Sequence, residues 1–120
     1  MTSAATDSAA TVAAVARFAA AFDSRDVDAV MATMTYDCIF ESTDPPAGRR
    51  HQGKAAVRAA WTEFFRASGG ARFEAEEQFA VDDRMVVRWR YTWGDGYVRG
   101  VDVFRVRDGL VAEKLSYVKG

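Results

Sequence analysis

The sequence predicts an α+β fold in which three helices cover one face of a curved antiparallel sheet. Two observations indicate this class. Apolar residues at helical spacing occur only in the first 67 residues, whereas residues 71–119 alternate in the manner of half-buried strands. Turn signals such as Gly94-Asp95-Gly96 and Asp108-Gly109 separate those later strands. Helices that precede a run of antiparallel strands are typical of α+β domains.

The helical part divides into three predicted helices. Asp7 or Ser8 can cap the first, which runs to about residue 24, and Asp26 can cap a short second helix. The third covers residues 53–67 and is ended by Gly69 and Gly70. The residues expected to face inward are Val12, Val15, Phe18, Ala19 and Phe22 in the first helix, Val27, Val30, Met31 and Met34 in the second, and Val57, Trp61, Phe64 and Phe65 in the third.

Five strands are predicted, one of them between the second and third helices. Residues 36–41 form that strand, and a loop over 42–52 follows because Pro45, Pro46 and Gly48 disfavour regular structure. The other strands cover residues 71–81, 84–93, 97–107 and 110–119. Simple alternation in the strand 71–81 puts one set of side chains on the inner face, namely Phe73, Ala75, Glu77, Phe79 and Val81.

Length and composition predict a single domain over residues 1–120, with 1–6 disordered at its start. The net charge of −1 and the lack of a basic stripe argue against nucleic-acid binding. The single Cys38 excludes an internal disulfide and a cysteine-based zinc site. No metal-ligand cluster or cofactor motif is visible, so we expect neither a metal nor a cofactor. Without a signal-peptide pattern or an apolar membrane span, we expect a cytoplasmic protein with no membrane partner.

Asp102 is the anomaly of the central hairpin. It shares one face of its strand with Gly100, Phe104 and Val106, where a charge is costly unless it is paired or protonated. Either this face of the strand is exposed to water, or the carboxyl group is held in a cavity where it has a function.

Several strings resemble the SnoaL-like and ketosteroid-isomerase-like branch of the nuclear-transport-factor-two-like superfamily. They are RFAAAF at 17–22, HQGKAAV at 51–57, VVRW at 86–89, GVDVFRV at 100–106 and the Asp108-Gly109 turn. The resemblance covers nearly the whole chain and implies a cone-shaped fold with an internal cavity. It does not by itself imply one reaction, because this fold carries isomerases, cyclases, hydrolases, dehydratases and proteins without activity.

The resemblance transfers the family's functional residues only in part. Asp102 matches the neutral aspartic acid in the oxyanion hole of ketosteroid isomerases, and also the acid/base of the SnoaL-like cyclases. The partner tyrosine of that oxyanion hole corresponds to Phe18, and the isomerase base falls near Ser42 or Asp44. The histidine of the cyclases is missing. The Asp-Arg-Asp positions of limonene-epoxide hydrolases hold Tyr91, Trp89 and Ser116, which argues against that reaction.

The direction of Lys114 decides how Asp102 would act. The register of the resemblance turns Lys114 and Ser116 inward, whereas the apolar pattern alone would turn Leu115 and Tyr117 inward. An inward Lys114 would keep Asp102 ionised and favour a base. We expect instead that its long stem reaches water and leaves Asp102 protonated, as a hydrogen-bond donor.

Two functions follow from these residues. The first is cofactor-independent proton transfer, of isomerase or cyclase type, on a small apolar or polycyclic carbonyl compound. Its candidate catalytic residues are Asp102, Tyr91, Asp44 and Lys114, and its candidate ligand-binding residues are Phe18, Phe22, Phe40, Ser42, Trp61, Phe65, Trp89, Trp93, Phe104 and Ser116. The second is a non-catalytic ligand-binding or dimerising domain. A homodimer through the outer sheet face is expected from Val101, Val103, Leu115 and Tyr117. His51 is expected on the surface, and a position at the mouth of the cavity is the alternative.

Overall fold

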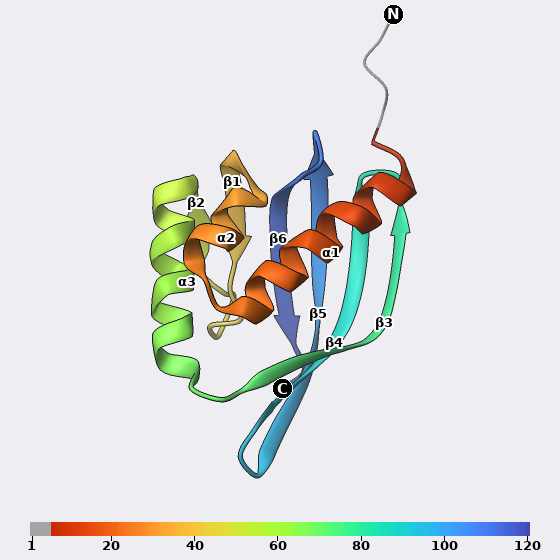
Figure 1. Cartoon of the computed structure of the whole chain (residues 1–120). Coiled ribbons are helices and arrows are strands. Elements are labelled where there is room, and N and C mark those ends of the chain that lie inside the picture. Colours follow the sequence, from red (N-terminus) through yellow and green to blue (C-terminus); the bar gives the residue numbers. More distant parts are fainter. Residues whose placement is uncertain (1–5) are drawn as a thin grey trace, which may run out of the picture.

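The computed structural model describes residues 6–120, so the disorder expected for the first residues falls almost entirely outside the described part. Three helices lie on one face of a six-stranded sheet, and α1 runs obliquely across β6, β5 and β4 (Figure 1). This confirms the predicted α+β fold. The elements are α1 Ser8–Ser24, α2 Val27–Ala32, β1 Met34–Glu41, β2 Arg50–Gln52, α3 Lys54–Ser68, β3 Arg72–Val81, β4 Arg84–Trp93, β5 Gly96–Arg107 and β6 Leu110–Val118.

The sheet is mixed rather than purely antiparallel. Its strand order is β2-β1-β6-β5-β4-β3, and β1 pairs with β6 in parallel while all other neighbours are antiparallel. Strand β2 was not predicted, because its three polar residues lie inside a stretch with strong turn signals. It forms by pairing with β1, where Phe40 lies opposite His51.

The helix ends follow the predicted caps. The side chain of Asp7 accepts a hydrogen bond from the backbone N–H of Ala10 at 2.7 Å, and that of Asp26 accepts one from Ala29 at 3.2 Å. These bonds satisfy backbone groups that a helix start leaves free. Within α1 two residues expected to face inward, Val12 and Ala19, are exposed, while Thr11 is buried and donates a hydrogen bond to the Asp82 carbonyl.

A register shift in β3 overturns part of the predicted alternation. Ala75 pairs with Trp89 and Glu77 pairs with Arg88, so Glu76 is an extra residue, as in a β-bulge. Beyond this point the two faces of β3 exchange. Phe79 and Val81, expected inside, are 54% and 65% exposed, and the inner positions go to Gln78 and Ala80.

The register of β5 and β6 fixes the inner face of the sheet. Asp102 lies opposite Ser116 and Phe104 lies opposite Lys114, with all four side chains buried. Leu115 and Tyr117 therefore face outward, as the resemblance implied and the apolar pattern did not. Val111 is fully buried, because the β5–β6 register shifts near Val106.

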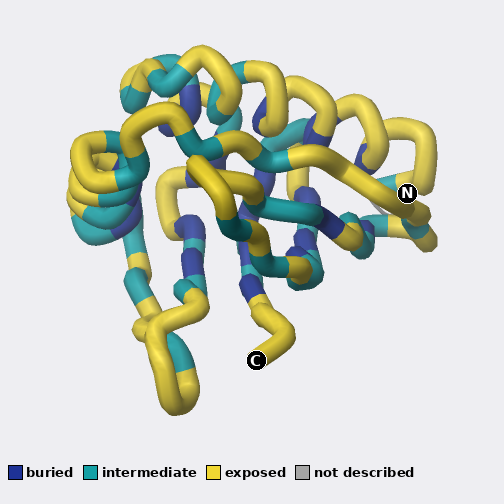
Figure 2. Tube along the Cα trace, turned by 90° about the horizontal axis from the view of Figure 1, so that it is seen from below, coloured by how far each residue is buried: buried dark blue, intermediate teal, exposed yellow. Residues whose placement is uncertain are grey.

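The core lies between the helices and the inner sheet face, where Figure 2 shows the buried residues gathered. Trp61, Val30, Val57 and Val111 are almost completely buried there. Cys38 is also fully buried in β1, and this burial raises the pKa of its thiol.

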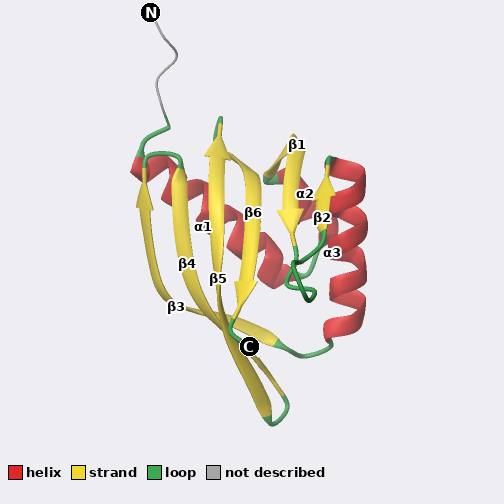
Figure 3. Cartoon of the chain, turned by 180° about the vertical axis from the view of Figure 1, so that it is seen from behind, coloured by secondary structure: helices red, strands yellow, loops and turns green. Residues whose placement is uncertain are grey.

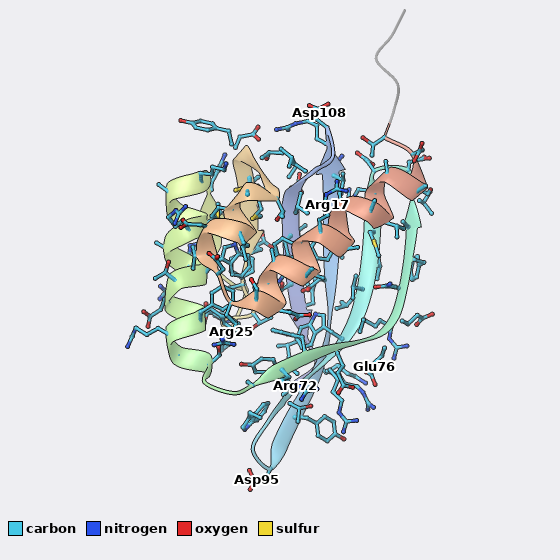
Figure 4. All side chains as sticks on the ribbon, in the orientation of Figure 1. Arg17, Arg25, Arg72, Glu76, Asp95 and Asp108 are labelled. Carbon is cyan, nitrogen blue, oxygen red and sulfur yellow. The ribbon has the colours of Figure 1, made fainter. Side chains whose placement is uncertain are left out.

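No helix of the described residues covers the outer sheet face, which Figure 3 shows from behind. Opposite charges pair across its strands: Arg88 contacts Glu77 at 2.7 Å and Arg99 contacts Glu76 at 2.9 Å. The hydrogen bond from Arg99 lowers the pKa of the Glu76 carboxyl group. The β4–β5 hairpin projects beyond the body of the molecule, with Asp95 at its tip (Figure 4).

Candidate functional site

Three buried polar side chains form a network on the inner face of β5 and β6. Asp102, Lys114 and Ser116 are each 8% exposed. The Ser116 hydroxyl donates to Asp102 Oδ1 at 2.7 Å and accepts from Lys114 Nζ at 2.8 Å. Lys114 Nζ also lies 3.4 Å from Asp102 Oδ2. The ammonium, the hydroxyl and the carboxylate therefore contact one another within a largely dry site.

Strand geometry brings these groups together. Lys114 and Ser116 are two residues apart in β6 and share a face, and the antiparallel register sets Asp102 directly opposite Ser116. The expectation that Lys114 turns to water is wrong. Its Nζ lies 5.0 Å from the ring centroid of Phe40 and 5.3 Å from that of Trp61. The Lys114 ammonium therefore lies in contact with the Asp102 carboxyl group rather than in water.

Two neighbouring cavities meet at this network. The first has a volume of about 210 Å³, lies under α1, and reaches Asp102 and Lys114. The second, of about 780 Å³, lies between α3, the loop after β1 and the ends of β4 and β6, and it reaches Ser116. The two cavities share three wall residues, namely Phe22, Phe73 and Trp89. A ligand can thus approach the network from either side of an aromatic wall.

Most of the predicted ligand-binding residues line these cavities. Phe18 and Phe104 line the first, Phe22 and Trp89 line both, and the second is lined by Phe40, Ser42, Trp61, Trp93 and Ser116. Phe65 lines neither of them. Its ring centroid lies 4.9 Å from that of Phe22, and the Arg25 guanidinium lies over it at 5.2 Å, so it is a packing residue.

Two predicted catalytic residues lie apart from the network. Asp44 and Tyr91 line the larger cavity, where neither has a hydrogen bond to Asp102, Lys114 or Ser116. Asp44 is exposed and accepts a hydrogen bond from the Ser42 hydroxyl at 2.6 Å. Tyr91 packs on Phe73 with ring centroids 4.4 Å apart.

Several wall residues were not assigned to the ligand site by sequence reasoning, His51 and Phe73 among them. His51, expected on the surface, is half-buried, lines the larger cavity, and stacks on Phe40 with centroids 5.6 Å apart. The unpredicted strand β2 places it there. Phe73 was expected inside but was not assigned to the ligand site; its alternation with charged neighbours was the available signal. The indole N–H groups of Trp61 and Trp89 are buried without a hydrogen-bond partner among residues 6–120.

Residues 6–120 contain no group of three or more His, Cys, Asp or Glu side chains arranged to hold a metal ion. Over the same residues, no helix is both long and apolar enough to span a membrane.

The family profile for the SnoaL-like domain matches residues 15–114, which include Asp102 and Lys114 of the network. The chain belongs to the SnoaL-like family. No curated protein matches the sequence of this SnoaL-like domain. Among solved structures, an NTF2-like protein of unknown function from Mesorhizobium loti is 39% identical, with a TM-score of 0.82, and the match covers 94% of this chain and 93% of that one.

Other solved structures share the fold at lower identity. A Kribbella flavida protein named as a candidate ketosteroid isomerase is 23% identical, with a TM-score of 0.83 and coverage of 96% and 82% of the two chains. A Sinorhizobium meliloti protein named as a candidate polyketide cyclase is 25% identical, with a TM-score of 0.74 and coverage of 86% and 92%. The same fold is seen in TerC co-crystallized with polyporic acid, at 19% identity, a TM-score of 0.76 and 92% coverage of both chains.

Proposed function

We propose that this SnoaL-like domain binds a small apolar carbonyl compound and moves a proton on it, with Asp102 as the base and without a cofactor. The observation that carries the proposal is the Lys114–Ser116–Asp102 network at the junction of two apolar cavities. A carboxylate in such a site accepts a proton from the carbon next to a carbonyl group, and nearby donors stabilise the enolate oxygen that results.

Each member of the network has a distinct part in this mechanism. Lys114 holds Asp102 in its ionised form through the 3.4 Å contact, and its ammonium can also face a developing enolate oxygen. Ser116 is a positioning residue, since its hydroxyl fixes Asp102 Oδ1 and leaves Oδ2 as the atom nearest Lys114. Tyr91 and Asp44 act on the distal part of a ligand in the larger cavity.

The test uses binding and proton exchange, so it does not require the natural substrate. Flat carbonyl compounds are first screened by quenching of tryptophan fluorescence, because Trp61, Trp89 and Trp93 line the larger cavity. Ligands that bind are then followed by NMR for deuterium incorporation beside the carbonyl in D₂O. We expect Asp102→Asn to keep binding within about threefold and to slow exchange by about 100-fold or more. Asp95→Asn, at the hairpin tip, is the matched control (Figure 4).

A non-catalytic ligand-binding domain is the second candidate. The observation in its favour is that both carboxylate oxygens of Asp102 already have partners in Ser116 and Lys114. The same experiment separates the two functions. Ligands that bind without any exchange above the solution rate would support the binding domain and refute the proton-transfer enzyme.

We also propose that two copies associate through the outer sheet face. Tyr117 and Phe79 are each 54% exposed there, on a groove of about 530 Å³ that also includes Val101. Burial of this apolar surface would stabilise a homodimer. Light scattering at micromolar concentration should give a dimer that Tyr117→Arg converts to a monomer. Tyr36→Arg, at another exposed tyrosine, should leave the dimer intact, and a monomeric unmodified chain would refute the proposal.

A further inference from the structure

We propose that Lys114 is also a nucleophile, and that its amine captures an aldehyde or ketone in the first cavity as a covalent imine. This inference rests on the proposed function because it uses the same cavity and the same class of ligand. It adds a covalent step in which the lysine, rather than Asp102 alone, activates the carbonyl compound.

The surroundings of Lys114 differ from those of the other lysines. Its Nζ lies beneath the Phe40 and Trp61 rings, and the side chain reaches the first cavity, whose wall is otherwise largely apolar. Lys54 is only half-buried and Lys119 is exposed. An imine is hydrolysed readily in bulk water, so a carbonyl-capturing amine benefits from a site that excludes it.

A proton acceptor for the ammonium is already in place. Transfer of one proton from Lys114 Nζ to Asp102 Oδ2, over 3.4 Å, gives a neutral amine and a neutral carboxylic acid. Water around the pair favours the two charges, whereas removal of that water makes the charges more costly. An apolar ligand that fills the first cavity therefore shifts this equilibrium towards the nucleophilic amine.

The covalent step is balanced without an oxidant or a reductant. The Nζ lone pair attacks the carbonyl carbon and a C–N bond forms, while Asp102 gives its proton to the carbonyl oxygen. Asp102 then takes a second proton from nitrogen and delivers it to the new hydroxyl group, which leaves as water. The overall change converts the ammonium and the carbonyl compound into an iminium and one water, and Asp102 ends as the carboxylate.

The product retains the electrostatics of the resting site. The iminium carries one positive charge at the position of the ammonium, so its pairing with Asp102 is preserved. An iminium also withdraws electrons from the adjacent carbon more strongly than a carbonyl group does. Asp102 can then remove the proton from that carbon, which links the imine to the proposed proton transfer.

The experiment is reductive trapping with a flat, apolar aldehyde, 2-naphthaldehyde, and sodium cyanoborohydride. Peptide mapping by mass spectrometry gives the rate of labelling at each lysine of the folded chain. We expect Lys114 to be labelled about tenfold or more faster than Lys54 and Lys119, and this preference to vanish in urea. Asp102→Asn should slow labelling at Lys114 by about tenfold, because it removes the acid that protonates the carbonyl oxygen and the departing hydroxyl group.

Two arginine variants complete the design. Lys114→Arg keeps the positive charge but lacks the amine, so it should fold, bind the aldehyde by tryptophan quenching, and form no rapid adduct. In the Lys119→Arg variant, the rate of labelling at Lys114 should equal that in the unmodified chain. Equal labelling of all three lysines in the folded protein would overturn the imine. The proposed proton transfer would still stand if ketone ligands continued to exchange deuterium in an Asp102-dependent manner. Failure of the imine is therefore distinguishable from failure of the proposed function.

Discussion

Replacing Lys114 with methionine tests whether the buried network holds an ionised aspartate. Methionine keeps the unbranched apolar stem and removes the cation that lies 3.4 Å from Asp102 Oδ2. The variant must then either bury an unpaired carboxylate or protonate it. Protonating an ordinary aspartate, with a pKa of about 3.9, costs about 4 kcal/mol at pH 7, which sets an upper limit on the loss. Coulomb attraction at 3.4 Å and an effective dielectric constant of about 20 gives a similar value, about 5 kcal/mol.

We therefore expect Lys114→Met to lower the free energy of unfolding by about 3–4 kcal/mol at pH 7. The double variant Asp102→Asn/Lys114→Met should be more stable at pH 7 than Lys114→Met alone, because no buried charge remains.

Urea unfolding followed by tryptophan fluorescence measures all four proteins of this cycle at pH 7. Lys119→Met is the matched control, and its exposed position predicts a change within about 0.5 kcal/mol. If the losses of stability from the two single variants simply add up in the double variant, the ionised pair is refuted.

Three further predictions concern residues away from this pair. Cys38 should react with a thiol reagent at pH 8 far more slowly in the native protein than in urea, because burial both raises its thiol pKa and blocks access; equal rates would contradict the described core. Gly100→Ala should cost about 3 kcal/mol in urea unfolding, since the added Cβ would lie 2.3 Å from the Trp89 ring, whereas Gly70→Ala meets no atom within 4 Å and should be nearly neutral. The hydrogen bond from Arg107 lowers the pKa of the Asp37 carboxyl group, so the stability that this pair contributes is present above about pH 4 and is lost as the pH falls. The melting temperatures of Arg107→Gln and the unmodified protein should therefore differ at about pH 6 and converge at about pH 2.5.

Local sequence patterns were sufficient for most elements of the fold. Helix caps at Asp7 and Asp26 are short-range signals, and the structure uses both. Alternation in β5 placed Asp102 and Phe104 on the inner face correctly, because that strand has no register shift before Val106. The bulge at Glu76 left no comparable signal, so alternation failed for the second half of β3.

The site was less predictable, because its geometry depends on contacts between distant strands. The apolar pattern of β6 favours Leu115 inside, and only the pairing of β6 with β5 turns Lys114 and Ser116 to Asp102. The direction of the lysine amine then depends on the Phe40 and Trp61 rings, which belong to β1 and α3. No property of the segment around Lys114 specifies those neighbours.

The bulge at Glu76 also has a consequence for colloidal behaviour. Strand β3 forms one edge of the sheet, and its ten residues have backbone groups that no neighbouring strand of the described chain pairs on the outer side. A straight edge of this length is a template for adding strands from other molecules. The bulge interrupts that edge at its centre, next to the acidic side chains of Glu74 and Glu77. Deletion of Glu76 would straighten the edge and make this protein more prone to ordered aggregation.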